Sequence, residues 1–416
     1  MQSRSTPFGL FAGCSIVKWS KNVSHIQFDP EIDTRITRLD MSFLCELGEY
    51  LEKQPEIKNE LLFFPNSSLY NSGDEIRFVY FSNNNKGERL YQISSVTRTR
   101  FLDSLLEFSK IGSTRHDLIG HLVKMDITRQ VAEEYVDRMI ASQILGSELL
   151  PNVTGESYFK RICRILERIN SPDPTSVSKS TLSILKNVEQ MLEELDNRVV
   201  NSTGSYGEII SSLEDIGIPL KENRIFQADL VKGIQRNEVN MDIQTYLVDA
   251  WEVLNALSVK GNHTNLHYFA KRYLIRYGEE EMPLVEVLDA ESGIGYPVSN
   301  PLFSTPLVEG IQLSNSSGNQ FANLEWTQPQ RLLWEKLIVA KENNQYTIEL
   351  TEGDIAKMEV SWDDIPSSVS MIFRMVDDSD GCIYLESVGG ISAMNLLGRF
   401  SHLNAGIADI IQAIAR

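Results

Sequence analysis

The chain has 416 residues, of which 42% are hydrophobic, 9% aromatic and 23% charged. This length allows two or three domains with a sizeable buried core, and the composition excludes a disordered or fibrous protein. Acidic residues outnumber basic ones by 57 to 39, so the net charge is −18 and the whole chain would repel a nucleic-acid backbone. Any contact with nucleic acid must therefore be local.

The cysteines and histidines form no metal-binding pattern. The four cysteines lie far apart without a Cys-x-x-Cys pair, which is typical of reduced thiols in a cytosolic protein. His263 and His267 are four residues apart, but no third ligand accompanies them. No apolar run reaches the roughly 18 residues of a membrane span, and the stretch before Cys14 lacks the layout of a lipoprotein signal. We expect a soluble, cytoplasmic protein.

The first sixty or so residues are predicted to hold strands and one clear helix. A strand is expected at Cys14–Trp19. Apolar residues then recur at helical spacing from Met41 to about Pro55. Asp40 stands where an N-cap carboxylate would accept the first free amides of that helix.

Between Asn66 and Leu149 the pattern predicts three short strands and then three helices. The strands are expected at Ser68–Tyr70, Glu75–Ser82 and Arg89–Val96, and the helices at Arg100–Ser109, Arg115–Lys124 and Arg129–Ile144. This order, within roughly eighty residues, indicates a winged helix-turn-helix.

The usual task of that fold is DNA binding, but the third helix is acidic on balance. Its charged residues are Glu133, Glu134 and Asp137 against Arg129 and Arg138. Such a surface is poorly suited to a major groove. The unpaired edge of the strand at Arg89–Val96 could instead accept an extended peptide by strand addition, with the third helix supplying side-chain pockets.

The rest of the chain is predicted to be helical to about Leu213 and mixed beyond it. The expected elements are a strand at Arg224–Val231, helices at Met241–Val259 and Leu266–Tyr277, a strand at Pro283–Leu288, a loop over Ser292–Gly318, a helix at Gln330–Glu342, strands at Ser370–Val376 and Cys382–Val388, and a final helix from Ala405. Together these segments predict an α+β protein, a mixed multi-sheet domain with an inserted winged helix-turn-helix element.

Several short motifs set cations or hydroxyls beside turn-forming residues, and their order and wording resemble the N-terminal, glutamylating part of the lantibiotic dehydratase family. The matching pieces are RSTPFGLF at Arg4–Phe11, TRLDMSFL at Thr37–Leu44, the strand-rich segment at Asn66–Leu149, FQADLV at Phe226–Val231, RYGEEEMPLVEVLDAESGIGYP ending at Pro297, and GRFSHL at Gly398–Leu403. They span nearly the whole chain.

The resemblance implies an enzyme. Members of this family use glutamyl-tRNA to esterify Ser and Thr hydroxyls of a ribosomal precursor peptide, and a separate C-terminal domain then eliminates glutamate to leave dehydroamino acids. It follows that a leader peptide and glutamyl-tRNA are the expected partners and that no separate cofactor is expected. The winged segment would recognise the leader peptide, which agrees with its acidic third helix.

Carried over residue by residue, the resemblance implies that Arg4, Thr6, Asp40, Asp229 and Arg399 belong to the glutamylation site. Acyl transfer needs a positioned donor, a stabilised oxyanion and a route for the hydroxyl proton. We expect the two arginines to bind phosphate or the glutamate carboxylate, and Thr6 to orient by hydrogen bonds. The two aspartates would act as a base or fix the arginines, and helix capping or ion pairing is the alternative for both.

The resemblance also divides the chain into the start of the glutamylation domain (1–65), the leader-recognition element (66–149) and the remainder of the domain (150–416). Family members have a further N-terminal segment that contributes another arginine, and they continue well beyond GRFSHL. We therefore expect the rest of the glutamylation domain and the elimination domain to be missing from this chain, which would lack eliminating activity. Homodimer formation stays open.

Three alternatives remain. A relative of the peptide aminoacyl-tRNA ligases would form an amide at a peptide C-terminus in place of an ester. A non-catalytic subunit would bind the precursor peptide and deliver it to a partner. A winged-helix DNA regulator would bind duplex DNA in a salt-sensitive way.

Overall fold

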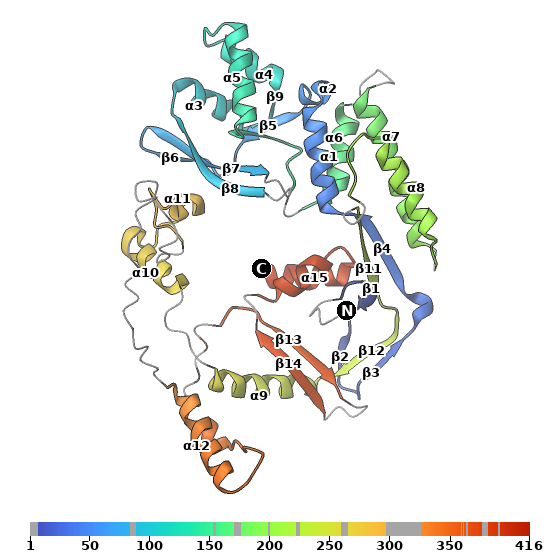
Figure 1. Ribbon diagram of the computed structural model, residues 1–416, viewed down its shortest axis with the longest axis vertical. Helices are drawn as coiled ribbons and strands as arrows, with labels where there is room; N and C mark the ends of the chain where they lie inside the picture. The colour runs from blue at the N-terminus through green and yellow to red at the C-terminus, as the bar shows by residue number, and fades with distance from the viewer. Residues whose placement is uncertain are drawn as a thin grey trace. The chain divides into compact units, whose positions relative to one another are not determined.

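The computed structural model describes residues 7–83, 89–152, 155–169, 176–198, 200–221, 225–258, 265–296, 326–358, 360, 362, 365–376, 382–389 and 392–416. The chain divides into two compact units (Figure 1). Unit 1 comprises Met1–Ile36, Ala228–Asn262 and Ser304–Arg416, and unit 2 comprises Thr37–Gln227 and His263–Phe303. The division falls inside two strands, β4 (Thr34–Leu39) and β11 (Phe226–Val231).

Unit 2 is mostly helical and carries two small antiparallel sheets, ordered β10-β5-β9 and β6-β7-β8. Its elements are α1 (Met41–Lys53), α2 (Pro55–Lys58), β5 (Leu62–Pro65), β6 (Tyr70–Ser72), β7 (Glu75–Asn83), β8 (Arg89–Thr97), α3 (Arg100–Phe108), η2 (Ser109–Ile111), β9 (Ser113–Thr114), α4 (Arg115–Val123), α5 (Arg129–Ala141), β10 (Leu145–Ser147), α6 (Tyr158–Ile169), α7 (Val177–Asp196), α8 (Thr203–Glu214), α10 (Asn265–Tyr277) and α11 (Leu284–Leu288).

A single apolar cluster joins most of these elements. Leu47 and Leu51 lie one helical turn apart on α1 and are fully buried, because residues four apart share a helix face. Ile76 and Phe78 are buried on β7, where alternate residues share a sheet face. The same cluster continues through α3 to α8.

Unit 1 is built from short sheets and helices. Its elements are β1 (Gly9–Cys14), β2 (Lys18–Ser20), β3 (His25–Phe28), η1 (Pro30–Ile32), β12 (Ile234–Asn240), α9 (Asp242–Leu257), α12 (Gln328–Glu342), α13 (Glu352–Ile355), β13 (Ser370–Met375), β14 (Ile383–Gly389), α14 (Met394–Leu397), η4 (Gly398–Phe400) and α15 (Ala405–Ala415). The sheets are β2-β12-β3 and β13-β14, and a third sheet has the order β1-β11-β4.

Two small cores stabilise unit 1. Val239 and Ile243 pack with Met371 and Phe373, so α9 and the β13-β14 hairpin share one of them. The second contains Phe400, Leu403 and Ile407, packed against Cys14, Ile16, Ile36, Val231 and Ile411. None of the helices in the described ranges is long and apolar enough to span a membrane.

Most predicted elements are confirmed, including the strands at Glu75 and Arg89 and the helices that begin at Arg100, Arg115 and Arg129. The three strands and three helices of residues 66–149 follow in the predicted order, the short strands β9 before α4 and β10 after α5 were not predicted, and the winged helix-turn-helix itself stays a prediction. The structure is mixed α/β with several small sheets. The predicted loop over 292–318 and His263 lie largely or wholly outside the described residues.

For four predicted elements the boundary or the type of secondary structure was wrong. The predicted strand at Pro283–Leu288 is the helix α11, since five residues are too few to distinguish the two periods. The strand expected at Cys14–Trp19 is split into β1 and β2. The side-chain oxygen of Asn66 accepts a hydrogen bond from the Ser68 amide at 3.0 Å and folds residues 66–68 into a turn. The strand β6 therefore starts only at Tyr70. α5 ends at Ala141, shortly before Gln143 adopts a φ of 60°.

α4 begins with a capping box. The hydroxyl of Thr114 accepts from the Asp117 amide at 3.2 Å, and the Asp117 carboxylate accepts from the Thr114 amide at 3.3 Å. We predict that Thr114→Ala lowers the free energy of unfolding by about 1 kcal/mol, because the Asp117 amide loses its acceptor. Urea denaturation followed by circular dichroism measures this. Thr97→Ala, at an exposed strand threonine, is the control, and an equal loss in both variants would contradict the prediction.

Candidate functional site

A buried carboxylate in unit 1 holds two side chains of the GRFSHL motif. The side chain of Asp229, on β11, is 4% exposed. Arg399 donates from Nη2 to its Oδ1 at 3.1 Å, and Nε2 of His402 lies 3.3 Å from its Oδ2. The Nε of Arg399 is itself buried and has no hydrogen-bond acceptor within the described part of the chain. The guanidinium therefore has donor capacity that Asp229 does not use.

The first motif lies beside the same residue through backbone strand pairing. β1 pairs with β11 in parallel, and Gly9 of RSTPFGLF is the register partner of Asp229. Gly9 has a φ of 56°, which favours glycine. At Gly13 a Cβ would lie 2.8 Å from the carbonyl oxygen of Leu230, so only glycine permits this approach of the strands. Three motifs that are distant in the sequence thus meet at Asp229.

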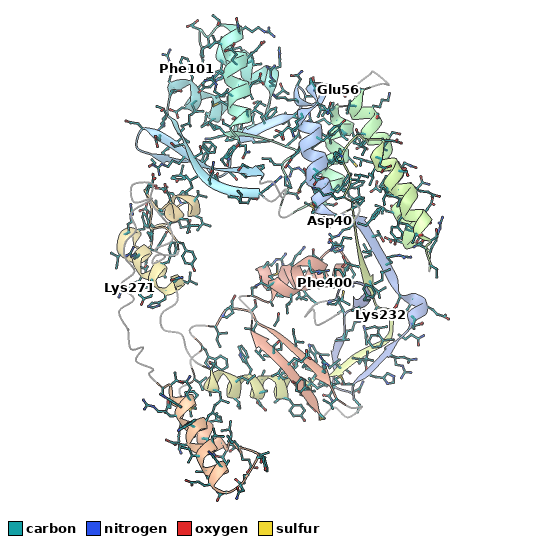
Figure 2. All side chains as sticks on the ribbon, in the orientation of Figure 1. Asp40, Glu56, Phe101, Lys232, Lys271 and Phe400 are labelled. Carbon is teal, nitrogen blue, oxygen red and sulfur yellow. The ribbon has the colours of Figure 1, made fainter. Side chains whose placement is uncertain are left out.

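The GRFSHL motif forms a tight turn before α15 (Figure 2, Phe400). Phe400 and Leu403, three residues apart, enter the apolar core, whereas Arg399 and His402, also three residues apart, face Asp229. A 3₁₀ turn places residues i and i+3 on one side, so a single turn separates an apolar pair from a polar pair. Arg399 also lies over the Phe400 ring, 4.7 Å from its centroid.

Cys14 ends β1 close to this carboxylate. Burial raises the pKa of the Cys14 thiol, and the negative charge of Asp229 raises it further. The thiol therefore stays protonated and serves as part of the apolar wall beside Ile16 and Val231.

Asp40 of the TRLD motif lies in unit 2, at the start of α1 (Figure 2). Its carboxylate accepts from the Ser42 amide at 2.8 Å, and its own amide donates to the carbonyl of Ile225 at 2.8 Å. The capping role that the sequence left open is therefore present, and a catalytic role for Asp40 stays a prediction. Arg4 and Thr6 lie outside the described residues.

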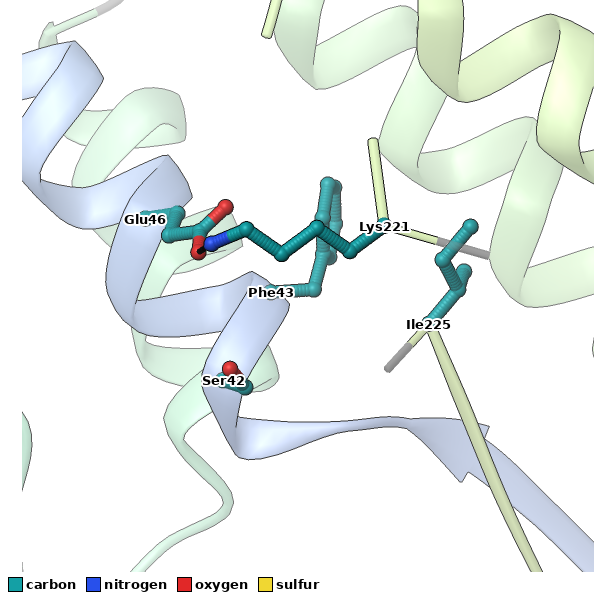
Figure 3. Close-up of a pocket in the computed structure, with 5 residues that line it drawn as sticks. All are labelled: Ser42, Phe43, Glu46, Lys221 and Ile225. Atoms are coloured by element: carbon teal, nitrogen blue, oxygen red, sulfur yellow. Dashed lines mark hydrogen bonds and ion pairs between the residues drawn. The ribbon is translucent and has the colours of Figure 1, made fainter. Parts of the chain in front are cut away.

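A shallow pocket follows directly on Asp40. It is lined by Ser42, Phe43, Glu46, Lys221 and Ile225 (Figure 3). Lys221 donates to Glu46 at 2.7 Å across it, so its two charged groups satisfy each other. We assign it no ligand.

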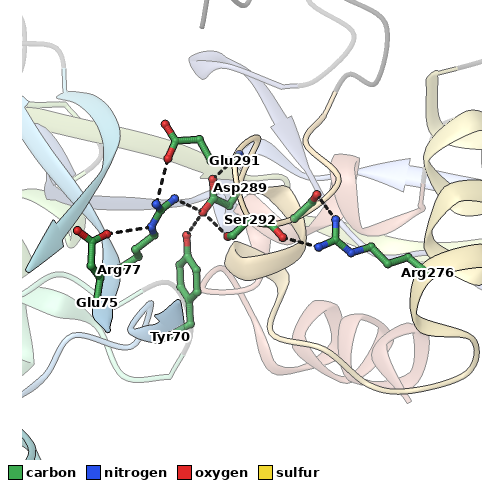
Figure 4. Close-up of polar contacts among 8 residues, drawn as sticks. Tyr70, Glu75, Arg77, Arg276, Asp289, Glu291 and Ser292 are labelled. Carbon is green, nitrogen blue, oxygen red and sulfur yellow. Dashed lines mark hydrogen bonds and ion pairs between the residues drawn. The ribbon is translucent and has the colours of Figure 1, made fainter. Parts of the chain in front are cut away.

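A second buried carboxylate organises unit 2 (Figure 4). Asp289, just after α11, accepts from Tyr70 at 2.7 Å, from Arg77 at 2.8 Å, from Ser292 at 2.5 Å and from the Glu291 amide at 2.9 Å. Burial alone would raise its pKa, but these donors hold the pKa of Asp289 well below the usual range.

The same network anchors α10. Arg276 donates to the carbonyls of Ser292 and Gly293, at 2.7 and 2.5 Å. The segment that matches RYGEEEMPLVEVLDAESGIGYP is thus fastened to β6 and β7 at one end and to α10 at the other. The contacts of Asp289 and Arg276 are internal to unit 2, which supports a structural role for the segment.

The β6-β7-β8 sheet presents an open edge at β8, which has no second strand partner in the described ranges. Val79 and Phe81 of β7 direct their backbone groups away from β8, since they bond to Ser68 and Gln143. In an antiparallel pair of strands, two opposite residues either exchange backbone hydrogen bonds or both point their amides and carbonyls away from each other. Their partners are Ile93 and Tyr91, and Ser95 follows in the same alternation. These three residues therefore point their amides and carbonyls to the open edge.

The family model for the N terminus of lantibiotic dehydratases matches residues 1–416. The chain belongs to this family. It is 25% identical over 421 residues to the subtilin biosynthesis protein SpaB of Bacillus subtilis, covering 99% of this chain and 38% of SpaB. It is 22% identical over 422 residues to the nisin biosynthesis protein NisB of Lactococcus lactis subsp. lactis, covering 99% of this chain and 40% of NisB.

The fold agrees with this membership. The crystal structure of the tRNA dependent lantibiotic dehydratase MibB from Microbispora sp. 107891 superposes with a TM-score of 0.67 at 21% identity, covering 92% of this chain and 37% of MibB. The chain thus spans less than half the length of these three proteins.

Sequence reasoning missed two polar residues of this chain. His402 stands inside the GRFSHL motif, but only the fold brings it to Asp229. Asp289 begins the run Asp-Ala-Glu-Ser-Gly, and an Asp side chain that accepts the amide two residues later is a common turn signal. That signal predicts a turn and does not predict the partners Tyr70 and Arg77, which come from β6 and β7.

Proposed function

We propose that this chain is the part of a lantibiotic dehydratase that transfers glutamate from glutamyl-tRNA to Ser and Thr hydroxyls of a precursor peptide. The observation that carries the proposal is the meeting of RSTPFGLF, FQADLV and GRFSHL at the buried Asp229. Motifs so distant in sequence meet at one carboxylate when they build one site.

The proposed reaction is an exchange of esters. The hydroxyl oxygen of the peptide attacks the glutamyl carbonyl, a tetrahedral oxyanion forms, and the ribose oxygen of the tRNA leaves with the proton that the hydroxyl gives up. One ester bond forms as another breaks, so no oxidant or reductant is consumed. The donor is already activated, and we therefore propose glutamyl-tRNA as co-substrate without a separate cofactor.

Arg399 is proposed to bind an anionic group of the donor, either a phosphate or the glutamate carboxylate. Its side chain is 32% exposed and pairs with Asp229 through Nη2, which supports this, because a guanidinium has further N–H donors and forks onto such groups. Its ion pair with Asp229 supports a fixing role for that aspartate over a role as base. Arg4, Thr6 and Asp40 stay in the proposal on the strength of the motifs.

The peptide is proposed to add as a strand along β8, within the element 66–149 that we interpret as a winged helix-turn-helix. The outward amides of Tyr91, Ile93 and Ser95 support this, and so does the exposure of Tyr91 and Ile93 on one face. DNA binding is disfavoured because α5 is acidic on balance and one of its two arginines is already paired. Arg129 pairs with Glu133 at 3.1 Å.

Asp137 of α5 also pairs with neighbouring cations. Arg115 and Lys58 contact it at 2.7 and 3.1 Å. These cations lower the pKa of Asp137 to about 2. Neither is then free to neutralise a phosphate.

A leader-binding experiment tests the peptide half of the proposal. A labelled leader peptide from a neighbouring precursor gene is titrated with the protein and followed by fluorescence anisotropy, with labelled duplex DNA alongside. We predict saturable leader binding that resists salt, and none to DNA. Ser95→Pro removes one outward amide but no bond to β7, so leader affinity should fall about tenfold.

Ser95→Ala is the matched control, since it keeps the amide and should bind as the wild type does. Equal leader affinity in Ser95→Pro and Ser95→Ala would overturn addition at β8. Binding to duplex DNA instead of the leader would overturn the peptide reading as a whole.

Product analysis tests the transfer itself. Incubation with precursor peptide and glutamyl-tRNA should yield a glutamyl ester on Ser or Thr, which alkali hydrolyses. An amide at a peptide C-terminus would favour a peptide aminoacyl-tRNA ligase. An unchanged pathway output after Arg399→Ala would favour a non-catalytic binding subunit.

A further inference from the structure

The edge of β7 that faces away from β8 is closed by side chains. β6 pairs with β7 from Glu75 to Arg77, so beyond it the outward backbone groups of Val79 and Phe81 need other partners. Phe81 donates its amide to Oε1 of Gln143 at 3.0 Å, and its carbonyl accepts from Nε2 of Gln143 at 2.9 Å. A residue of a neighbouring strand would make the same two bonds, so the Gln143 side chain takes the place of a strand.

Two further side chains continue this edge. Val79 donates its amide to Oγ of Ser68 at 2.9 Å, and its carbonyl accepts from Nδ2 of Asn66 at 3.1 Å. The same Nδ2 of Asn66 donates to the backbone carbonyl of Gln143 at 2.8 Å. The partners of Val79 are thereby joined to the partner of Phe81, and all four outward backbone groups of these two residues are satisfied.

Gln143 makes its pairing from a backbone position at which glycine is more usual. It follows α5 and has a φ of 60°. Its amide donates to the carbonyl of Ile140 at 3.0 Å, and the Ile144 amide donates to the carbonyl of Met139 at 3.1 Å. These are the two bonds of a Schellman turn, whose left-handed residue is strained when it carries a side chain. A glycine would avoid the strain but could not make the contact with Phe81.

This pairing connects α5 to the strand beside the proposed peptide-binding edge. Phe81 is the register partner of Tyr91, and Val79 is that of Ile93. β7 is therefore held from one side at the two residues whose partners point their backbone groups to the open edge of β8. Since α5 ends two residues before Gln143, the same side chain fastens the end of that helix to the sheet. α5 is also the helix that we expect to supply pockets for the side chains of the peptide.

We propose that Gln143 is a positioning residue for the precursor peptide: by pairing with Phe81 it keeps α5 and the β7-β8 hairpin in the arrangement that accepts a strand along β8. This inference rests on the proposed function. Gln143 pairs with the opposite edge of the sheet and does not touch the peptide. Without the pairing, the element adopts the peptide-accepting arrangement only part of the time, and the apparent affinity falls by that fraction.

The test measures leader binding by the full chain and by three variants, with a labelled leader peptide followed by fluorescence anisotropy and stopped flow. Gln143→Gly suits the left-handed backbone, so the turn is kept while the pairing with Phe81 is lost. Leader affinity should fall about tenfold through slower association, with an unchanged dissociation rate, because fewer molecules are ready to bind. Hydrogen exchange at the Phe81 amide should accelerate, since that amide loses its acceptor.

Two matched controls separate positioning from general stability. Asp126→Gly makes the same kind of change at another exposed left-handed residue of this element, with a φ of 65°, between α4 and α5. Thr114→Ala removes the cap of α4 and lowers stability without touching Gln143. Both variants should bind the leader with wild-type affinity.

Each remaining result decides against a part of the proposal. Wild-type affinity in Gln143→Gly, unchanged exchange at the Phe81 amide, or an equal loss of affinity in Thr114→Ala would overturn the positioning role and leave the proposed function standing. A loss confined to the dissociation rate would mean that the peptide contacts Gln143 directly, which also overturns that role. If the wild-type chain does not bind the leader, the peptide half of the proposed function fails, and the inference fails with it.

Discussion

Replacing Asp229 with asparagine is expected to reduce the rate of glutamyl transfer about 100-fold, a loss of roughly 3 kcal/mol of transition-state stabilisation. The amide is nearly isosteric but carries no charge, so it cannot hold the guanidinium of Arg399 as an ion pair. Arg399 then samples orientations in which its free donors miss the substrate. The measurement is the rate of ester formation on the precursor peptide with saturating glutamyl-tRNA.

Asp409→Asn is the matched control, since Asp409 is an exposed carboxylate on α15 in the same unit. It should transfer glutamate at the wild-type rate. If Asp229→Asn also does so, Asp229 has no part in the reaction and the proposed site is wrong.

The same variant has a readout that does not depend on activity. Asp229 helps to raise the pKa of the Cys14 thiol, so Asp229→Asn should lower that pKa and speed alkylation of Cys14 at mildly alkaline pH. Peptide mass spectrometry distinguishes Cys14 from the other cysteines. An unchanged alkylation profile would mean that the carboxylate and the thiol are not neighbours.

Asp289→Ala is expected to lower the stability of unit 2 by about 3 kcal/mol. The carboxylate side chain is 4% exposed and accepts from Tyr70, Arg77 and Ser292, all of which lose their partner when it is removed. Among the described residues, Arg77, 17% exposed, then keeps the carboxylates of Glu291 at 3.0 Å and Glu75 at 3.6 Å. The segment that fastens α10 to the β6-β7-β8 sheet should detach before the core unfolds.

Hydrogen exchange and denaturation measure this loss. Exchange should accelerate in peptides from 265–296 and from β6 and β7. All five tryptophans lie in unit 1, so tryptophan fluorescence should show an unchanged unit 1 transition while circular dichroism shows the loss in unit 2. Glu279→Ala, at an exposed carboxylate of the same segment, should change neither signal. Equal stability of Asp289→Ala and the wild type would contradict the assigned role.

The contribution of Asp289 should depend on pH. Its pKa is lower in the folded protein than in the unfolded chain, so the unfolded state takes up its proton first as the pH falls. The stabilisation is therefore fully present above about pH 4 and declines as the pH falls toward the folded-state value. The stability difference between wild type and Asp289→Ala should shrink over that acidic range, and a difference that grows there would contradict the assignment.

Sequence reasoning succeeded where a local rule acts alone. Asp40 caps α1 as expected, because an N-cap needs only a carboxylate and the next amides. The strands β7 and β8 and the helices α3 to α5 followed from the local strand and helix patterns of the sequence. α11 was mistaken for a strand because a five-residue apolar segment fits both periods.

For the site, the sequence by itself determined which motifs are present and therefore the family, since a motif is a property of contiguous residues. Asp229 and Arg399 were named from motifs alone, and the fold joins them at 3.1 Å. Only the tertiary structure decided that His402 lies on the same carboxylate, that Asp289 meets Tyr70 and Arg77, and that β8 directs Ser95 outward. Each of these depends on strand register and on turns packed against a core. Such contacts form between residues far apart in the chain, where no local periodicity carries information about them.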